Sequence, residues 1–292
     1  MKPRHLAFIA LIDIVWAFNI VAIKFALNEV PPLTAVFIRY AIVLGVCLPW
    51  LKWLPGRMTS VLIAGVVGGA LFFGIGAIGF SIADNVSALA VAGQLGVPFS
   101  LILAVLVLGE RIRWPRMIGI GLAFAGVVVL GFDPAIAHEQ LALILTIGAA
   151  LLWAISSLMF RQLKGVPALT IHAWLAVVSL PLLGVASLIF EPGQLARVGD
   201  LRVATIGWLA YSAIGASVVG HGGMSWLLQR YPVSVISPLT LPTPLLSVII
   251  AVVVLGNPLT PQLVLGGLIT LVGIAIIAIR TAQAQDRAEE PG

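Results

Sequence analysis

The chain has 292 residues, of which 61% are hydrophobic and only 9% are charged. A soluble domain carries roughly 25% charged residues, so this composition excludes a soluble globular protein and indicates an all-α polytopic membrane protein. The net charge of +5 is not organised as a basic patch with interleaved aromatic residues, which argues against a nucleic-acid partner. Cys47 is the single cysteine, which excludes an intrachain disulfide and a cysteine-based metal site.

Apolar segments of the length needed for a membrane-spanning helix, about 20 residues, follow one another along the chain. The first segment resembles a signal peptide, but Asp13 interrupts it, no small-residue cleavage pattern follows, and the apolar run reaches Leu27. We therefore interpret it as a first span. The ten expected spans are residues 6–27, 33–51, 60–83, 86–108, 115–132, 141–160, 170–190, 203–228, 233–255 and 261–280.

The basic residues of the connecting loops fall mainly on one side of this arrangement. Twelve lie on the side of the N-terminus and two, Arg197 and Arg202, lie on the other, while Lys24 and Arg39 are within spans. By the positive-inside rule, both termini are expected in the cytoplasm. The polar tail, residues 283–292, is expected to be disordered.

The sequence contains an internal duplication. An offset of 147 positions pairs Ser87 with Ser234 and Gly119 with Gly266, without a gap across that run. The opening spans agree at a shorter offset, with Trp16 opposite Trp153. Each copy has five spans, an odd number, so the second copy enters the membrane from the opposite side and forms an inverted repeat. The expected repeats are residues 1–136 and 137–282.

Each copy has one span that residues unfavourable to helices interrupt at the same place. Residues 87–100 contain Gly93, Gly96 and Pro98, and residues 234–247 contain three prolines. Proline removes a backbone donor and clashes with the preceding turn, so these helices bend or open. Paired interrupted spans in the two halves of a transporter indicate a substrate site near the membrane midplane, although two kinked packing helices are the alternative.

Short motifs in both copies resemble the EamA family of the drug/metabolite transporter superfamily. They are residues 15–24 (VWAFNIVAIK) with Arg39-Tyr40, and residues 108–111 (LGER) with Gly119 and Gly126; Asn257 departs from this pattern, where the family usually has Glu. The resemblance implies a ten-span carrier that exports amino acids and related metabolites, similar to the bacterial amino-acid exporters, including those for aromatic amino acids. Its expected partners are the small-molecule substrate and membrane lipids, and it is expected to be a monomer or homodimer.

Charged residues within the first two spans are candidates for substrate contact. Asp13, Trp16 and Lys24 share one helix face, and an acid inside a span usually faces the bundle interior or water. Asp13 could attract an ammonium group or bind a proton, or could reach the headgroups. Lys24 could likewise reach the membrane surface. Arg39 could bind a substrate carboxylate or hold neighbouring helices through their carbonyl oxygens.

Other candidates are aromatic or neutral hydrogen-bonding side chains within spans. Trp16 and Trp153 are matched mid-span residues, His221 could relay protons or serve packing, and hydroxyl and amide groups lie beside the interrupted helices. The neutral groups at the helix breaks, Gln94, Ser100, Ser237, Thr240 and Thr243, are the main hypothesis. The full candidate set is Asp13, Trp16, Asn19, Arg39, Gln94, Ser100, Trp153, Tyr211, His221, Ser237, Thr240 and Thr243.

Three function classes can be weighed on these features. A secondary carrier with alternating access agrees with the inverted repeat and needs no cofactor. An enzyme is disfavoured because the four histidines are scattered and no metalloprotease, nucleophile-elbow or phosphate-loop motif is present. A channel-like pathway, or an exporter of other drug-like solutes, is the alternative. Proton antiport and facilitated diffusion both fit the sequence.

Overall fold

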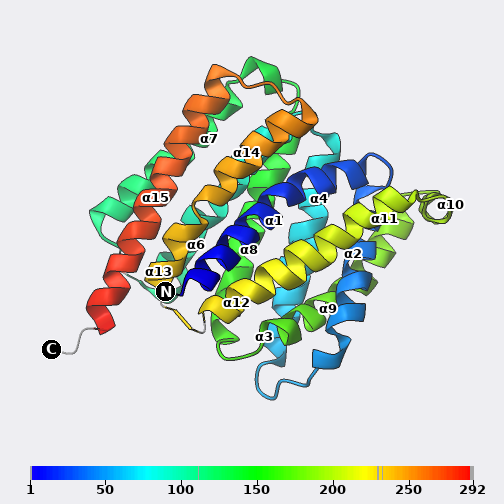
Figure 1. The fold of residues 1–292 in the computed structure, drawn as a ribbon, viewed down its shortest axis with the longest axis horizontal. Coiled ribbons are helices and arrows are strands. Elements are labelled where there is room, and N and C mark those ends of the chain that lie inside the picture. The colour runs from blue at the N-terminus through cyan, green and yellow to red at the C-terminus, as the bar shows by residue number, and fades with distance from the viewer. Residues whose placement is uncertain (1, 111, 229, 232, 290–292) are drawn as a thin grey trace.

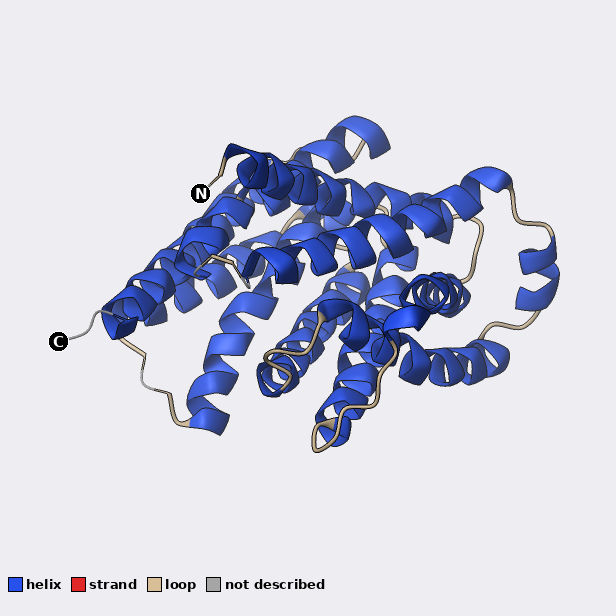
Figure 2. Ribbon diagram, turned by 60° about the horizontal axis from the view of Figure 1, so that its bottom comes forward, coloured by secondary structure: helices blue, strands red, loops and turns tan. Residues whose placement is uncertain are grey.

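The computed structural model describes residues 2–110, 112–228, 230–231 and 233–289, and all regular structure in these residues is helical (Figures 1 and 2). Nine helical segments in this part of the chain are long and apolar enough to cross a membrane, and Pro242–Leu255 is a shorter apolar helix. Together they occupy the ten positions expected from the sequence. The chain is therefore a polytopic membrane protein of ten helices, as predicted.

The first half of the chain forms five spans, of which the third and fourth are each divided into several helical segments. The third span combines two α-helices around a π-helix, and the fourth combines two α-helices around a 3₁₀ turn. The elements are α1 (Pro3–Leu27), α2 (Pro32–Cys47), η1 (Leu48–Trp50), α3 (Met58–Ala64), η2 (Gly65–Leu71), α4 (Phe72–Ile82), α5 (Val86–Ala92), η3 (Gly93–Leu95), α6 (Gly96–Leu108) and α7 (Trp114–Gly131).

The second half repeats this order after a short 3₁₀ turn, η4 (Pro134–Ile136). Its third span again contains a π-helix, and its fourth again contains a 3₁₀ turn. The elements are α8 (Gln140–Gln162), α9 (Ala168–Phe190), α10 (Gln194–Gly199), α11 (Val203–Ala210), η5 (Tyr211–His221), α12 (Gly222–Leu228), α13 (Val233–Ile236), η6 (Ser237–Thr240), α14 (Pro242–Leu255) and α15 (Pro261–Glu289).

Helix ends and interruptions follow from local sequence. Proline stands in the first turn of α2, α7 and α14, where its missing N–H has no intrahelical partner to lose. Gly109 and Gly256, 147 positions apart, end α6 and α14 with φ of 66° and 70°. Only glycine adopts this left-handed backbone without strain, so the fourth span of each repeat ends with the same C-cap.

Contacts between the spans obey a two-fold relation. α2 packs on α9, and α7 packs on α15, so equivalent spans of the two repeats meet. The remaining contacts are equivalent in the two repeats. The first span of the first repeat, α1, packs on η5 and α14, in the third and fourth spans of the second repeat. The first span of the second repeat, α8, packs on η2 with α4 and on α6, in the third and fourth spans of the first repeat. This exchange is the pattern of an isologous interface within one chain, as the inverted repeat requires.

The α7–α15 pair makes the closest backbone approach of this arrangement (Figure 1). A Cβ atom on Gly119 would lie 2.8 Å from the carbonyl oxygen of Gly273, and one on Gly266 would lie 2.6 Å from that of Gly126. The contacts are reciprocal, because residues 119 and 266 are repeat equivalents, as are residues 126 and 273. Gly119 and Ala123 thus both pack against Gly273 within the chain.

Both chain ends lie at the same end of the bundle in Figures 1 and 2, which we call the termini side; the opposite end is the far side. α15 continues as a helix to Glu289, and the expectation of disorder in the tail stays a prediction. Residues 290–292 of that expectation lie outside the described residues. The tail extends the last span instead of leaving it at residue 280.

Candidate functional site

A cavity of about 300 Å³ lies in the far half of the bundle, between the two repeats. Its walls come from the ends of α1 and α4, the beginnings of α2, α5 and α8, and the junction of α11 with η5. Most of the lining is apolar, including Phe72, Phe73 and Phe80. The polar side chains in the lining are Asn19, Arg39, Gln94, Thr146 and Ser212. The structure thus brings together three candidates from the sequence, Asn19, Arg39 and Gln94.

Arg39 carries a buried guanidinium group at this cavity. Its Nη2 atom donates to Ser217 Oγ at 2.8 Å, and its Cζ atom lies 4.3 Å from the ring centroid of Phe73. None of the ion pairs among the described residues involves Arg39. A guanidinium has five N–H donors, so Arg39 retains donors and positive charge for an anionic ligand group.

Two further polar atoms at the cavity are buried without a hydrogen-bond partner. They are Asn19 Oδ1, an acceptor, and Ser212 Oγ, which can donate or accept. An unsatisfied buried polar atom costs roughly 1–3 kcal/mol, so each such atom calls for a partner that the protein itself does not supply. Ser212, the second residue of the π-helical segment of the eighth span, was not singled out from the sequence.

Four rings form a cluster on the termini side of the cavity. His221 lies 5.0 Å from Trp16, 6.0 Å from Trp153 and 5.6 Å from His172, measured between ring centroids. Trp153 also contacts Phe72, a residue of the cavity wall, at 5.2 Å. Trp153 therefore packs behind the cavity wall, while neither tryptophan is part of the lining itself. His172 was missed because nothing local marks it; only the packing of α9 on η5 brings it to His221.

Below the rings, a plug of four buried aliphatic residues fills the termini half of the bundle. Ile9 and Ile12 of α1 pack there against Leu227 and Ile236 of the second repeat. Beside them, the Thr243 hydroxyl donates to Asp13 Oδ1 at 2.7 Å. Asp13 is only 4% exposed, so it faces the bundle interior, away from the open cavity.

The remaining candidates from the sequence do not line the cavity in the part of the chain that the structure describes. Tyr211 donates its hydroxyl to the carbonyl oxygen of Val15 at 3.0 Å, and Ser100 donates to that of Gly96 at 2.7 Å. Thr240 ends the 3₁₀ turn η6, and the side chain of Ser237 lies outside the described residues. The neutral groups at the two helix breaks thus do not converge on one open pocket in this state.

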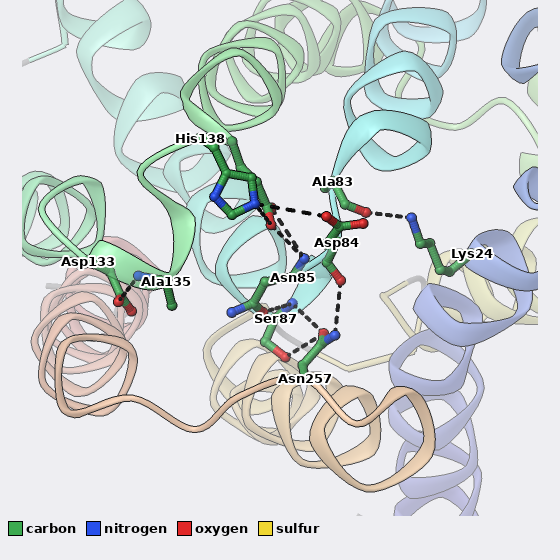
Figure 3. A network of polar contacts seen from close by, with 10 residues as sticks. Lys24, Ala83, Asp84, Asn85, Ser87, Asp133, Ala135, His138 and Asn257 are labelled. Carbon is green, nitrogen blue, oxygen red and sulfur yellow. Dashed lines mark hydrogen bonds and ion pairs between the residues drawn. The ribbon is translucent and has the colours of Figure 1, made fainter.

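Polar side chains tie the helices together at the far-side rim of the cavity (Figure 3). Lys24 Nζ donates to the carbonyl oxygens of Phe80, at 3.3 Å, and Ala83, which close the last turn of α4. Asn257 donates through Nδ2 to the Asp84 carbonyl oxygen at 3.1 Å and accepts from Ser87 N at 3.2 Å. Lys24 thereby acts as a helix cap, and Asn257 links the second repeat to the start of α5.

A possible set of metal ligands lies at the same rim. Asp84, His138 and Glu139 each present one ligand atom, all within 4.8 Å of one another (Figure 3). The Glu139 carboxylate already accepts the backbone N–H of Asn85 at 3.1 Å and so caps the turn into α5. The positively charged Lys24 bonds to the adjacent Ala83, which disfavours a cation there. These residues fit a structural network better than a metal centre.

Comparisons with known proteins agree with this architecture. The pattern of the EamA-like transporter family matches residues 4–132 and 140–279, one match to each half of the chain. A "Probable amino-acid metabolite efflux pump" of Escherichia coli K12 is 29% identical over 91% of this chain and 92% of its own length. An "Uncharacterized transporter" of Archaeoglobus fulgidus is 28% identical over 90% of this chain and 94% of its own.

One further sequence relative and one solved structure are also similar to this chain. A "Probable terminal-alkyne amino-acid exporter" of Streptantibioticus cattleyicolor is 24% identical over 66% of this chain and 64% of its own length. A solved crystal structure superimposes with a TM-score of 0.64 over 99% of this chain and 100% of that one. Its sequence identity is 17%, so it speaks for the fold alone.

Proposed function

Because the chain belongs to the EamA-like transporter family, we propose that it is a secondary transporter that exports amino acids and related small metabolites across the bacterial inner membrane. Relatives that match nearly the whole chain carry names that specify amino-acid metabolite efflux. Membership of a transporter family also speaks against enzymatic activity. The substrate moves by alternating access between the two inverted repeats.

The observation that carries this proposal is the cavity with one unpaired cation and one unsatisfied acceptor. Arg39 provides a guanidinium for an α-carboxylate, and Asn19 Oδ1 provides an acceptor for an α-ammonium. Arg–carboxylate hydrogen bonds are charge-assisted and can be bidentate, which fixes orientation as well as affinity. The apolar walls then face the substrate side chain. A zwitterion with an uncharged side chain satisfies both polar groups at once.

The arrangement of open and closed regions corresponds to one state of the transport cycle. The cavity lies in the far half, while the ring cluster and the plug fill the termini half. The excess of basic loop residues on the termini side supports a cytoplasmic position for both termini. In that orientation the cavity faces the periplasm, so the state is the one that releases an exported substrate.

A ligand series tests the two polar contacts without altering the protein. In proteoliposomes, counterflow of radiolabelled phenylalanine is measured with competing phenylalanine, phenylalanine amide or phenethylamine. We expect the amide and the amine, which lack the carboxylate, to compete at least tenfold more weakly, because the charge-assisted bonds to Arg39 are worth about 1.5–3 kcal/mol. Equal competition by all three would exclude a carboxylate site at Arg39.

The alternative of a channel-like pathway gives a different flux. A carrier saturates and distinguishes L- from D-amino acids, because its bound substrate contacts Arg39, Asn19 and the apolar walls together, and three contacts are needed to discriminate enantiomers. A continuous pore shows flux that rises linearly with concentration and shows no counterflow. Measuring initial rates over a wide range of substrate concentration, for both enantiomers, separates the two. Export of other drug-like solutes would appear as transport that requires neither zwitterion group.

A further inference from the structure

We propose that the chain has a second substrate site on the termini side, centred on Asp13, which binds the ammonium group of the incoming amino acid before the plug closes over it. This inference rests on the proposed function, because it concerns the substrate on its way to the far-side cavity. The inference is based on residues at equivalent positions in the two repeats. On the far side these positions line an open cavity, and on the termini side they are packed together.

The duplication assigns each cavity position a partner in the other repeat. The opening spans correspond at the offset of Trp16 and Trp153, and the third and fourth spans correspond at 147 positions. By these offsets, Thr146 and Ala149 of the cavity wall correspond to Ile9 and Ile12. In the same way, the cavity residues Phe80 and Leu89 correspond to the plug residues Leu227 and Ile236.

Equivalent positions therefore form an open wall on one side and a packed plug on the other. Ile12 and Leu227 are both 0% exposed, whereas their counterparts Ala149 and Phe80 border empty space. When two inverted repeats exchange conformations, the packing of each repeat becomes that of the other. The plug positions must then become cavity walls, and a cavity must appear on the termini side with Ile9, Ile12, Leu227 and Ile236 around it.

The residues that would line this hidden cavity include an acid, whereas the lining of the open cavity contains none among the described residues. Asp13 stands where the far-side cavity has Ala150, and Ser156 stands where it has Asn19. Ser156 Oγ is buried without a hydrogen-bond partner, as Asn19 Oδ1 is on the far side. An unpartnered polar atom at the matching position is independent support for a ligand site there.

The difference in charge between the two sites gives each a separate role. The termini-side site holds the carboxylate of Asp13, which attracts an ammonium, and the far-side cavity holds the guanidinium of Arg39, which attracts a carboxylate. An amino acid that enters from the termini side thus meets an acid first and an arginine later. Asp13 keeps one oxygen, Oδ2, beyond the Thr243 bond for this contact.

Cysteine labelling tests whether the hidden cavity forms. In a variant with Cys47→Ala, Ile12→Cys is compared with its repeat counterpart Ala149→Cys, using a small water-soluble maleimide. Without substrate, we expect Ala149→Cys to react at least tenfold faster, because only its cavity is open. Under conditions of counterflow, labelling of Ile12→Cys should rise while that of Ala149→Cys falls. If Ile12→Cys stays unreactive in a variant that transports, the hidden cavity is excluded.

A substitution tests the role of Asp13 itself. Asp13→Asn keeps an oxygen that accepts from Thr243 but removes the charge. We expect the ratio of the KM for substrate supplied from the termini side to the KM for substrate supplied from the far side to rise about tenfold, while kcat/KM changes equally in both directions, as detailed balance requires. Vesicles of both orientations give the two KM values, and Asp200→Asn, at an exposed residue, is the matched control. An unchanged ratio of the two KM values would overturn the assignment.

The two inferences fail in distinguishable ways. If the protein transports no amino acid, the proposed function is wrong, while labelling of Ile12→Cys still reports whether the termini side opens. If the protein transports amino acids and Asp13→Asn behaves like the wild type, only the second site is wrong.

Discussion

The α7–α15 pair and the bundle around the cavity are built in opposite ways, although both obey the same two-fold relation. In the pair, each span is one uninterrupted helix, and four glycines bring the backbones into direct contact. Around the cavity, the third spans contain π-helices and the fourth spans contain 3₁₀ turns. Irregular helical segments of this kind are common at functional sites. If the proposed alternating access holds, the α7–α15 pair serves as a fixed support and the irregular spans are the part that changes shape.

The largest expected effect comes from adding volume inside the fixed support. Gly126→Leu places a side chain against the Gly266 backbone and Thr270, where no flexible side chain can move aside. Overpacking against backbone should lower the free energy of unfolding by about 3 kcal/mol, seen as a lower Tm in detergent. Gly121→Leu is the control, because a Cβ there meets no atom within 4 Å. Similar Tm values for both variants would contradict a tight support.

A smaller effect is expected from changing the charge geometry at the cavity. Arg39→Lys keeps the positive charge but loses the planar fork and the stacking on Phe73. We expect KM for amino-acid transport to rise about tenfold, which corresponds to about 1.4 kcal/mol. Size-exclusion profiles should match those of the wild type. An unchanged KM would assign Arg39 to helix packing through Ser217 and not to the substrate.

The smallest effect is expected where a single irregular turn is made regular. Pro242→Ala restores a backbone donor at the start of α14, next to the 3₁₀ turn η6. If this turn changes during transport, kcat should fall about threefold, or ~0.7 kcal/mol, with Tm nearly unchanged. Initial rates in proteoliposomes measure it. Transport at the wild-type rate would show that the interruption serves packing, the alternative that the sequence left open.

The span order, the duplication and the interrupted helices were predictable from the sequence because each has a local cause. Long apolar runs predict the spans. Pro238 and Pro242 in one copy, and Gly93 and Gly96 in the other, predict the interruptions. Predicting these features does not require knowing which residues come into contact across long sequence separations. The offset pairs Gly119 with Gly266, but the close contact of the two spans that carry them was not predicted from it.

The membership of the cavity was predictable only in part. Asn19, Arg39 and Gln94 lie together at the cavity, but Asp13 and Thr243 bind each other across 230 positions of sequence and lie in the closed half. A sequence does not say which of two equivalent half-sites is open in a given state. Ser212 and His172 gained their neighbours from long-range packing alone, so no pattern near them could have revealed their positions.

Asn257 is the residue of the second repeat that departs from the family resemblance, and its contacts give that departure a physical sense. The amide donates to the Asp84 carbonyl and accepts from Ser87, whereas an ionised glutamate could only accept. The hydrogen-bonded link between Asn257 of the second repeat and the beginning of α5 therefore carries no charge. Added salt and a change in pH do not act directly on this link, in contrast to the charged contacts of Lys24 and Glu139 at the same rim.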